Sequence, residues 1–138
     1  MLAKEMQNHV IIVGYTHLGM RIVEHLRRWK QPYVLIDKDA AAVDDLIRDG
    51  EPIIVDDAKR DSSLSDAGIE RAKLLIVTSN NIETALLVTK RARDRNQKTH
   101  IIVRCYLVVF SMITSTTFPI PSSTSSKKPP RVPPVRSP

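Results

Sequence analysis

The stretch that decides the fold is "HVIIVGYTHLGMRIVEHL", residues 9–26, in which an apolar run leads into a glycine-containing turn and then into an amphipathic pattern. Turns that bind the phosphates of dinucleotides have the pattern Gly-x-Gly-x-x-Gly between a strand and a helix. Gly14 and Gly19 occupy the first and third glycine positions, but Thr16 occupies the second. Its β-branched side chain would either crowd a phosphate or offer it a hydroxyl group.

Short apolar runs recur downstream, and helical patterns separate them. The first of these patterns predicts a helix over 18–30, ended by Pro32, with an apolar face formed by Leu18, Ile22, Leu26 and Trp29. Further helices are expected at about 40–49, 61–67 and 81–95. The apolar runs are rich in β-branched residues and do not alternate with polar ones, as in strands covered on both faces. These strands are expected at 9–13, 33–37, 52–55, 73–78 and 100–104.

This alternation of strands and helices predicts an α/β fold, a Rossmann-like doubly wound parallel sheet with five recognisable strands. Ligands bind such sheets at the carboxyl ends of the strands, near the point where the strand order reverses. The expected site therefore comprises the turn at 14–19 together with Asp37, Asp57 and Thr78.

Asp37 ends the second expected strand, 23 positions after Gly14. Dinucleotide-binding folds place the acid that binds the ribose hydroxyls at about this distance. A helix-capping or solvent-exposed carboxylate is the alternative interpretation. The neighbouring Lys38 would suit a 2′-phosphate, but Asp37 would repel that group, so the pair favours NAD or an adenosine nucleotide over NADP.

The composition excludes several classes of function. Four of the six net positive charges belong to residues 107–138, and aromatic residues make up only 4% of the chain, so nucleic-acid binding is not expected. Cys105 is the only cysteine, which excludes an intramolecular disulfide and fits a reducing compartment. The first apolar run is far shorter than the roughly 20 residues that a bilayer requires, and no secretion signal is expected.

Residues 107–138 differ in character from the rest of the chain. They are rich in Ser, Thr and basic residues, lack acidic residues and contain seven of the nine prolines. Such a composition does not form a core. We expect this basic Ser/Pro-rich tail to be disordered, or to be the product of a reading-frame change or a wrong gene boundary; a genuine regulatory tail is the alternative.

The segments "HVIIVGYTHLG", "YVLIDKD", "DDAKRDSSLSDAGIERAKLLIVTSNN" and "IIVR" together resemble the regulator of potassium conductance (RCK) domain, also called the Trk-type NAD-binding domain. The resemblance covers residues 8 to about 106, and its most specific part is residues 55–78. It implies a cytoplasmic, non-enzymatic regulatory domain that senses NAD, NADH or an adenine nucleotide such as ADP, ATP or AMP. It also implies a homodimer, often assembled into rings, that controls a membrane-embedded potassium channel or transporter, with residues 1–7 as a linker stub.

The resemblance also implies roles for single residues. Asp37 resembles the ribose-binding acid, Asp57 and Ala58 the step beside the adenine, and Thr78 with Ser79 the rim of the fourth strand. Thr16, Asp56 and His17 depart from the family, which has glycine at the first two positions and often a phosphate-binding arginine at the third. The helix and sixth strand that complete the family's domain are not recognisable after Arg104. The full set of expected ligand-binding residues is Gly14, Thr16, His17, Leu18, Gly19, Asp37, Lys38, Asp57, Ala58 and Thr78.

Other chemistry finds less support in the sequence. The four histidines, His9, His17, His25 and His100, do not pair on a helical face, so we expect capping or solvated imidazoles and no metal site. Asp56, Asp57 and Asp61 suit a hard cation such as calcium, although adjacent residues of an extended segment point to opposite sides. The alternative function is a fragment of an NAD-dependent oxidoreductase, which would need a substrate domain and a proton donor.

Overall fold

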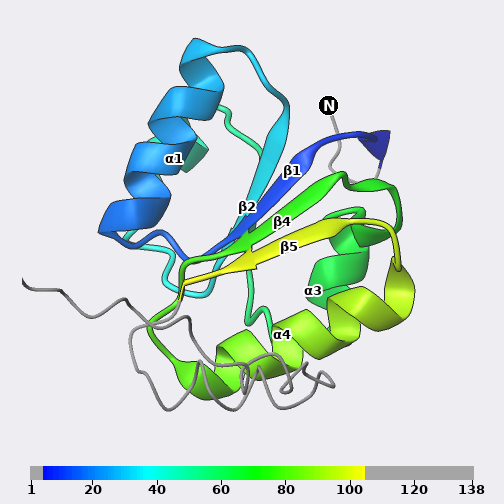
Figure 1. Cartoon of the computed structure of the whole chain (residues 1–138). Helices are drawn as coiled ribbons and strands as arrows, with labels where there is room; N and C mark the ends of the chain where they lie inside the picture. Colours follow the sequence, from blue (N-terminus) through cyan, green and yellow to red (C-terminus); the bar gives the residue numbers. More distant parts are fainter. Residues whose placement is uncertain (1–4, 105–138) are drawn as a thin grey trace, which may run out of the picture. The chain divides into compact units, whose positions relative to one another are not determined.

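The predicted Rossmann-like sheet is confirmed by a computed structural model, which describes residues 5–104 (Figure 1). Five parallel strands are arranged in the order β3-β2-β1-β4-β5. The predictions for the tail and for Cys105 lie outside the described residues. In chain order the elements are β1 (Val10–Val13), α1 (His17–Arg28), β2 (Tyr33–Asp37), α2 (Asp44–Arg48), β3 (Ile53–Val55), α3 (Asp61–Asp66), the 3₁₀ turn η2 (Ile69–Arg71), β4 (Leu74–Val77), α4 (Ile82–Arg95) and β5 (His100–Val103).

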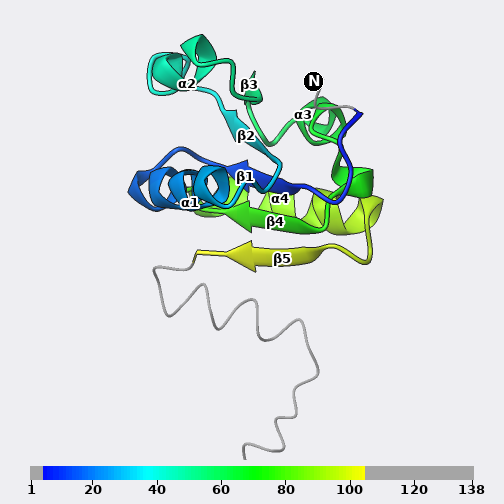
Figure 2. The same cartoon turned by 90° about the horizontal axis from the view of Figure 1, so that it is seen from above.

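The strand order reverses at β1, which lies between β2 and β4. In register, Ile12 pairs with Leu35 on β2 and with Ile76 on β4. Figures 1 and 2 show α1 on one face of the sheet and α3 and α4 on the other, as right-handed crossovers require. The core between β1, β2 and the first two helices is formed by Val10, Ile12, Val23, Tyr33, Leu35, Val43 and Leu46.

The prediction that every strand is covered on both faces is correct only for the centre of the sheet. All four residues of β1 are buried, whereas Val55 on β3 is 44% exposed and Ile102 on β5 is 54% exposed. Within residues 5–104, β3 and β5 are the edge strands, and each has a hydrogen-bonded neighbour on one side only.

The first helix ends two residues earlier than predicted. Lys30 adopts a left-handed conformation with φ 59°, its amide donates to the carbonyl of Arg27, and the amide of Gln31 donates to the carbonyl of Leu26. These two bonds form a Schellman motif, which usually has glycine at the left-handed position. Trp29 therefore lies outside the helix and is 72% exposed, contrary to its predicted place on the apolar face.

The second helix is shorter than predicted and begins only at Asp44. The side chain of Asp39 accepts hydrogen bonds from the amides of Ala41 (3.1 Å) and Ala42 (3.3 Å) and holds a turn before the helix. Aspartate competes for backbone amides in this way, and so favours turns over helix interiors.

His9 was predicted to be a capping or solvated imidazole, and this is wrong. The side chain is fully buried, and its Nε2 donates to the carbonyl of Ala67 at 2.7 Å. Burial lowers the pKa of His9, and the nearby Arg71 guanidinium lowers it further. Nδ1 has no hydrogen-bond partner among the described residues, so the neutral imidazole is the form that fits this position.

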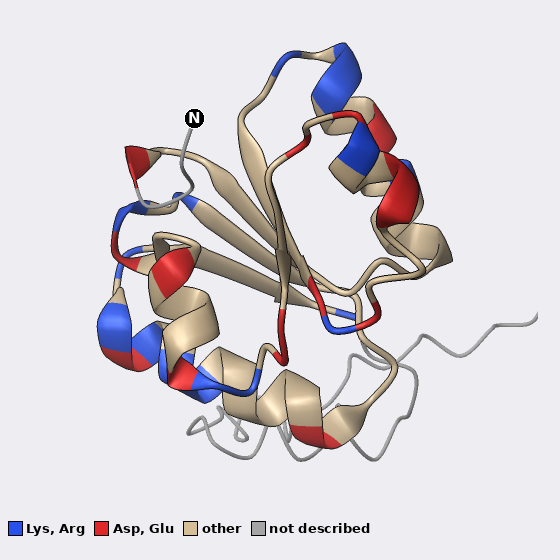
Figure 3. Cartoon of the chain, turned by 180° about the vertical axis from the view of Figure 1, so that it is seen from behind, with Lys and Arg blue, Asp and Glu red and all other residues tan. Residues whose placement is uncertain are grey.

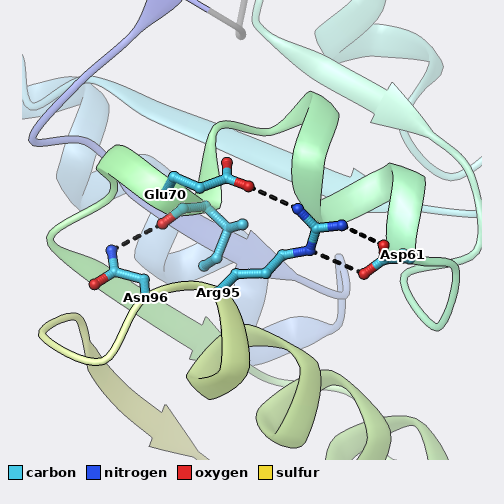
Figure 4. Close-up of polar contacts among 5 residues, drawn as sticks. Asp61, Glu70, Arg95 and Asn96 are labelled. Atoms are coloured by element: carbon cyan, nitrogen blue, oxygen red, sulfur yellow. Dashed lines mark hydrogen bonds and ion pairs between the residues drawn. The ribbon is translucent and has the colours of Figure 1, made fainter.

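A polar cluster ties the end of α4 to α3 and η2 (Figure 4). The Arg95 guanidinium forms ion pairs with Asp61 and with Glu70, the latter at 2.7 Å. The Asn96 amide donates to the carbonyl oxygens of Ile69 and Ala72 at 2.9 and 3.1 Å. These contacts fix the α4 terminus, from which the chain enters β5.

Candidate functional site

The turn after β1 requires glycine at both ends. Gly14 has φ 103°, and a Cβ there would lie 2.9 Å from Oγ1 of Thr78. Gly19 is buried in the first turn of α1, and a Cβ there would lie 2.2 Å from the carbonyl oxygen of Gly14. The helix therefore starts in direct contact with the end of the strand, as in phosphate-binding turns.

Thr16 fits the backbone of the turn without strain. Its φ of −84° and ψ of −177° are extended, so this position does not need glycine for conformational reasons. Its hydroxyl caps α1 by accepting from the amide of Gly19 at 3.2 Å, and it donates to Oγ1 of Thr78 at 3.0 Å. The hydroxyl is therefore engaged within the protein.

Asp37 holds the turn from the end of β2. One carboxylate oxygen accepts from the amide of Tyr15 at 2.7 Å, and the other accepts from the amide of Asp39 at 2.8 Å. A carboxylate oxygen accepts more than one hydrogen bond, so both oxygens keep capacity for ligand hydroxyls. Asp37 thus positions the turn and also faces the space beside it.

The segment after β3 carries two acids in a fixed arrangement. The Asp57 amide donates to the Asp56 carboxylate at 2.7 Å and keeps the pKa of Asp56 below its usual range. The Asp57 carboxylate accepts from the amide of Lys59 at 2.9 Å, and the Asp57 carbonyl accepts from the Ser63 hydroxyl at 2.8 Å. These bonds form the turn that leads into α3.

A crevice of about 180 Å³ lies at the carboxyl ends of the strands, where the strand order reverses. Six of the ten expected ligand-binding residues line it, namely Gly14, Thr16, Asp37, Lys38, Asp57 and Ala58. The other four, His17, Leu18, Gly19 and Thr78, lie in adjoining positions of α1 and at the end of β4 without forming its wall. Residues not in the expected set also line it, namely Val13, Ile36, Asp56, Ser79, Asn80, Asn81 and Thr84.

The polar residues that follow β4 were not among the ten expected ligand-binding residues, although the sequence contains a pattern that could have identified them. The "SNN" sequence at 79–81 precedes α4, and Asn81 caps that helix by accepting from the amide of Thr84 at 2.9 Å. A capping asparagine a few residues after a buried strand marks the start of a second helix at the same edge of the sheet.

The crevice is acidic. Three aspartates and one lysine line it, so the formal charge of its wall is −2. Figure 3 shows the acidic segments at the ends of β2 and β3. The positive end of the α1 dipole is the main feature that would favour a phosphate here.

Within residues 5–104, no three His, Cys, Asp or Glu side chains come together in an arrangement that could hold a metal ion. The calcium interpretation of Asp56, Asp57 and Asp61 therefore finds no cluster to support it. Asp61 instead forms the ion pair with Arg95. No helix in the same range is long and apolar enough to span a bilayer.

The fold and the crevice together define a Rossmann-like α/β domain with a crevice at the carboxyl ends of its parallel strands. The chain belongs to the TrkA-N domain family, whose sequence profile matches residues 10–113. This confirms the resemblance seen in the sequence.

The chain is 32% identical over 103 residues to potassium channel protein 1 of Methanocaldococcus jannaschii. It is 28% identical over 99 residues to the putative K(+) efflux antiporter KefB of Alkalimonas amylolytica. These alignments cover 73% and 72% of this chain but only 31% and 15% of the two relatives, so the chain spans less than a third of either.

Among solved structures, the TrkA-N domain of the inner membrane protein YbaL from Escherichia coli superimposes with a TM-score of 0.76 at 26% identity, covering 89% of this chain and 94% of that one. The Kef C-terminal domain of Shewanella denitrificans in its AMP-bound form gives a TM-score of 0.66 at 22% identity, covering 86% and 74%. The second likeness concerns the fold alone.

Proposed function

We propose that the crevice binds an adenosine nucleotide and that its occupancy regulates a potassium channel or potassium transporter. The observation that carries the proposal is the convergence of the glycine turn, the start of α1 and the Asp37 carboxylate on one crevice at the strand-order reversal. The TrkA-N membership and the channel and antiporter relatives support the regulatory part.

Each group in the site has a role in this proposal. The carboxylate of Asp37 accepts hydrogen bonds from the ribose hydroxyls while it continues to hold the amide of Tyr15. The first amides of α1, at His17 and Leu18, have no acceptor within the helix and bind the phosphate. Asp57 and Ala58 lie beside the adenine, with Lys38 at the rim, while the buried Thr78 supports the turn from behind through its bonds to Thr16 and Gly14.

No chemical step is needed for regulation. A ligand changes a conformational equilibrium only if it binds one conformation better than the other, and a homodimer or ring joined to the pore in the cytoplasm is the assembly that would transmit this difference. The non-enzymatic character is part of the proposal. Turnover of a reduced nicotinamide cofactor by the purified protein would contradict it.

Thermal unfolding with added AMP, ADP, ATP, NAD or NADH tests the binding. A ligand at about 100 times its Kd stabilises the folded state by roughly 2.7 kcal/mol, so at least one nucleotide is expected to raise the melting temperature clearly. Asp37→Ala is expected to lose this rise.

Asp45→Ala is the matched control. It removes the same charge from a side chain that is 91% exposed on α2, outside the crevice. We expect this variant to respond to nucleotide as the parent does. An Asp37→Ala variant with an undiminished response would show that the crevice is assigned wrongly.

A further inference from the structure

A chain of hydrogen bonds crosses the point where the strand order reverses. The Gly19 amide donates to the Thr16 hydroxyl (3.2 Å), and the Thr16 hydroxyl donates to Oγ1 of Thr78 (3.0 Å). Thr78 then donates to the carbonyl of Gly14 at 2.7 Å. The carbonyl of Val13 also lies within 3.2 Å of the Thr78 hydroxyl, so both threonine hydroxyls have a donor and an acceptor partner within the protein.

This chain joins the two halves of the sheet on either side of the reversal. Thr16 follows β1, and Thr78 follows β4, so their hydrogen bond spans the gap between the turn and the second half of the fold. A bound dinucleotide lies across the same gap, with its pyrophosphate against the turn and one nucleoside over each half of the sheet. A nucleotide with a single nucleoside needs only the half that contains Asp37.

Two further properties of the crevice favour the smaller ligand. Its volume of about 180 Å³ lies below the roughly 300–1,000 Å³ of sites that enclose drug-sized ligands, so a dinucleotide would extend further outside it than a nucleotide with one nucleoside. The Thr16 hydroxyl also accepts the hydrogen bond of the Gly19 amide, which would otherwise be available to a phosphate. Its side chain adds three heavy atoms at a position where the dinucleotide-binding pattern has glycine.

We infer that Thr16 is a specificity-determining residue that restricts the crevice to nucleotides with one nucleoside, such as AMP, and excludes dinucleotides such as NAD. This inference rests on the proposed nucleotide-binding function and names its ligand class. Thr16 acts by bulk and by its bond to Thr78, which place its side chain in the middle of a crevice lined from both halves of the sheet, where the pyrophosphate of a dinucleotide would have to pass.

Isothermal titration of the parent chain with AMP and with NAD tests the inference. We expect AMP to bind at least tenfold more tightly than NAD. In Thr16→Gly the ratio of the NAD dissociation constant to the AMP dissociation constant is expected to fall at least tenfold, because the side chain and the bond to Thr78 are both lost. Thr16→Ser retains the hydroxyl chain and is expected to keep the ratio of the two dissociation constants within threefold of the parent.

The outcomes separate this inference from the function on which it rests. The proposed function stands if AMP binds the parent and Asp37→Ala abolishes that binding. In that case, equal affinity of the parent for NAD and AMP, or an unchanged ratio in Thr16→Gly, overturns only the role of Thr16. A Thr16→Ser ratio as low as that of Thr16→Gly would overturn the part assigned to the hydroxyl. If the parent binds neither AMP nor NAD, both the inference and the proposed function fail.

Discussion

Replacing Gly19 by alanine tests how closely α1 approaches the end of β1. At an ordinary helix position this change stabilises a protein by about 1 kcal/mol. Here the new Cβ would lie 2.2 Å from the carbonyl oxygen of Gly14 and 3.2 Å from Oγ1 of Thr78. The first obstacle is backbone and cannot rotate away, so we assign a cost at the upper end of overpacking penalties, about 3 kcal/mol.

The two effects leave a net destabilisation of roughly 2 kcal/mol. For a domain of this size that corresponds to a fall of roughly 8–16 °C in the melting temperature. Circular dichroism during thermal unfolding measures it, and Arg21→Ala, at an exposed position of the same helix, is the control, expected within about 0.5 kcal/mol of the parent. A Gly19→Ala variant as stable as the parent would refute the close approach of helix and strand.

Three further predictions concern features that lie outside the crevice. Lys30→Gly should stabilise the chain by about 0.5–1 kcal/mol in denaturant unfolding, because Lys30 has φ 59° at the end of α1; a loss of stability would argue against the left-handed conformation. His9 is buried with a lowered pKa, so the neutral imidazole contributes its full stability above about pH 6.5, the pKa of an ordinary histidine, and this contribution is lost as the pH falls through the lowered folded pKa. His9→Gln should therefore flatten the dependence of stability on pH below about pH 6.5, and an unchanged slope would contradict the buried neutral imidazole. The Arg95 side chain holds the pKa of Asp61 below its usual range, so the ion pair contributes its full stability above about pH 4 and loses it as the pH falls through the lowered folded pKa of Asp61. Arg95→Met should therefore reduce stability more at pH 7 than at pH 3, and equal deficits at the two pH values would contradict the ion pair.

Local patterns in the sequence were sufficient to predict the architecture. Each strand is a short apolar run, and the positions of Gly14 and Asp37 relative to those runs place the crevice at the carboxyl edge of the sheet. This inference needs no knowledge of tertiary contacts, because parallel strands joined by right-handed crossovers bring their carboxyl ends together. For the same reason the family resemblance was readable from Gly14, Asp37 and residues 55–78.

The features that escaped prediction depend on contacts between distant residues or on unusual residue choices. The end of α1 was misplaced because Lys30, and not glycine, takes the left-handed position. His9 is buried because it bonds to Ala67, 58 positions away, and the hydroxyl of Thr16 is engaged by Thr78, 62 positions away. No pattern in the sequence indicates that His9 pairs with Ala67 or that Thr16 pairs with Thr78.

Titration of the ¹⁵N-labelled chain with AMP, followed by amide NMR, tests the central claim most directly. The account predicts that the largest shifts occur at the amides of residues 14–19, at Asp37 and at Ala58, which surround the crevice. The contradicting result is the absence of saturable shifts, or shifts confined to residues such as Asn8, Lys73 and Lys98 at the opposite ends of the strands.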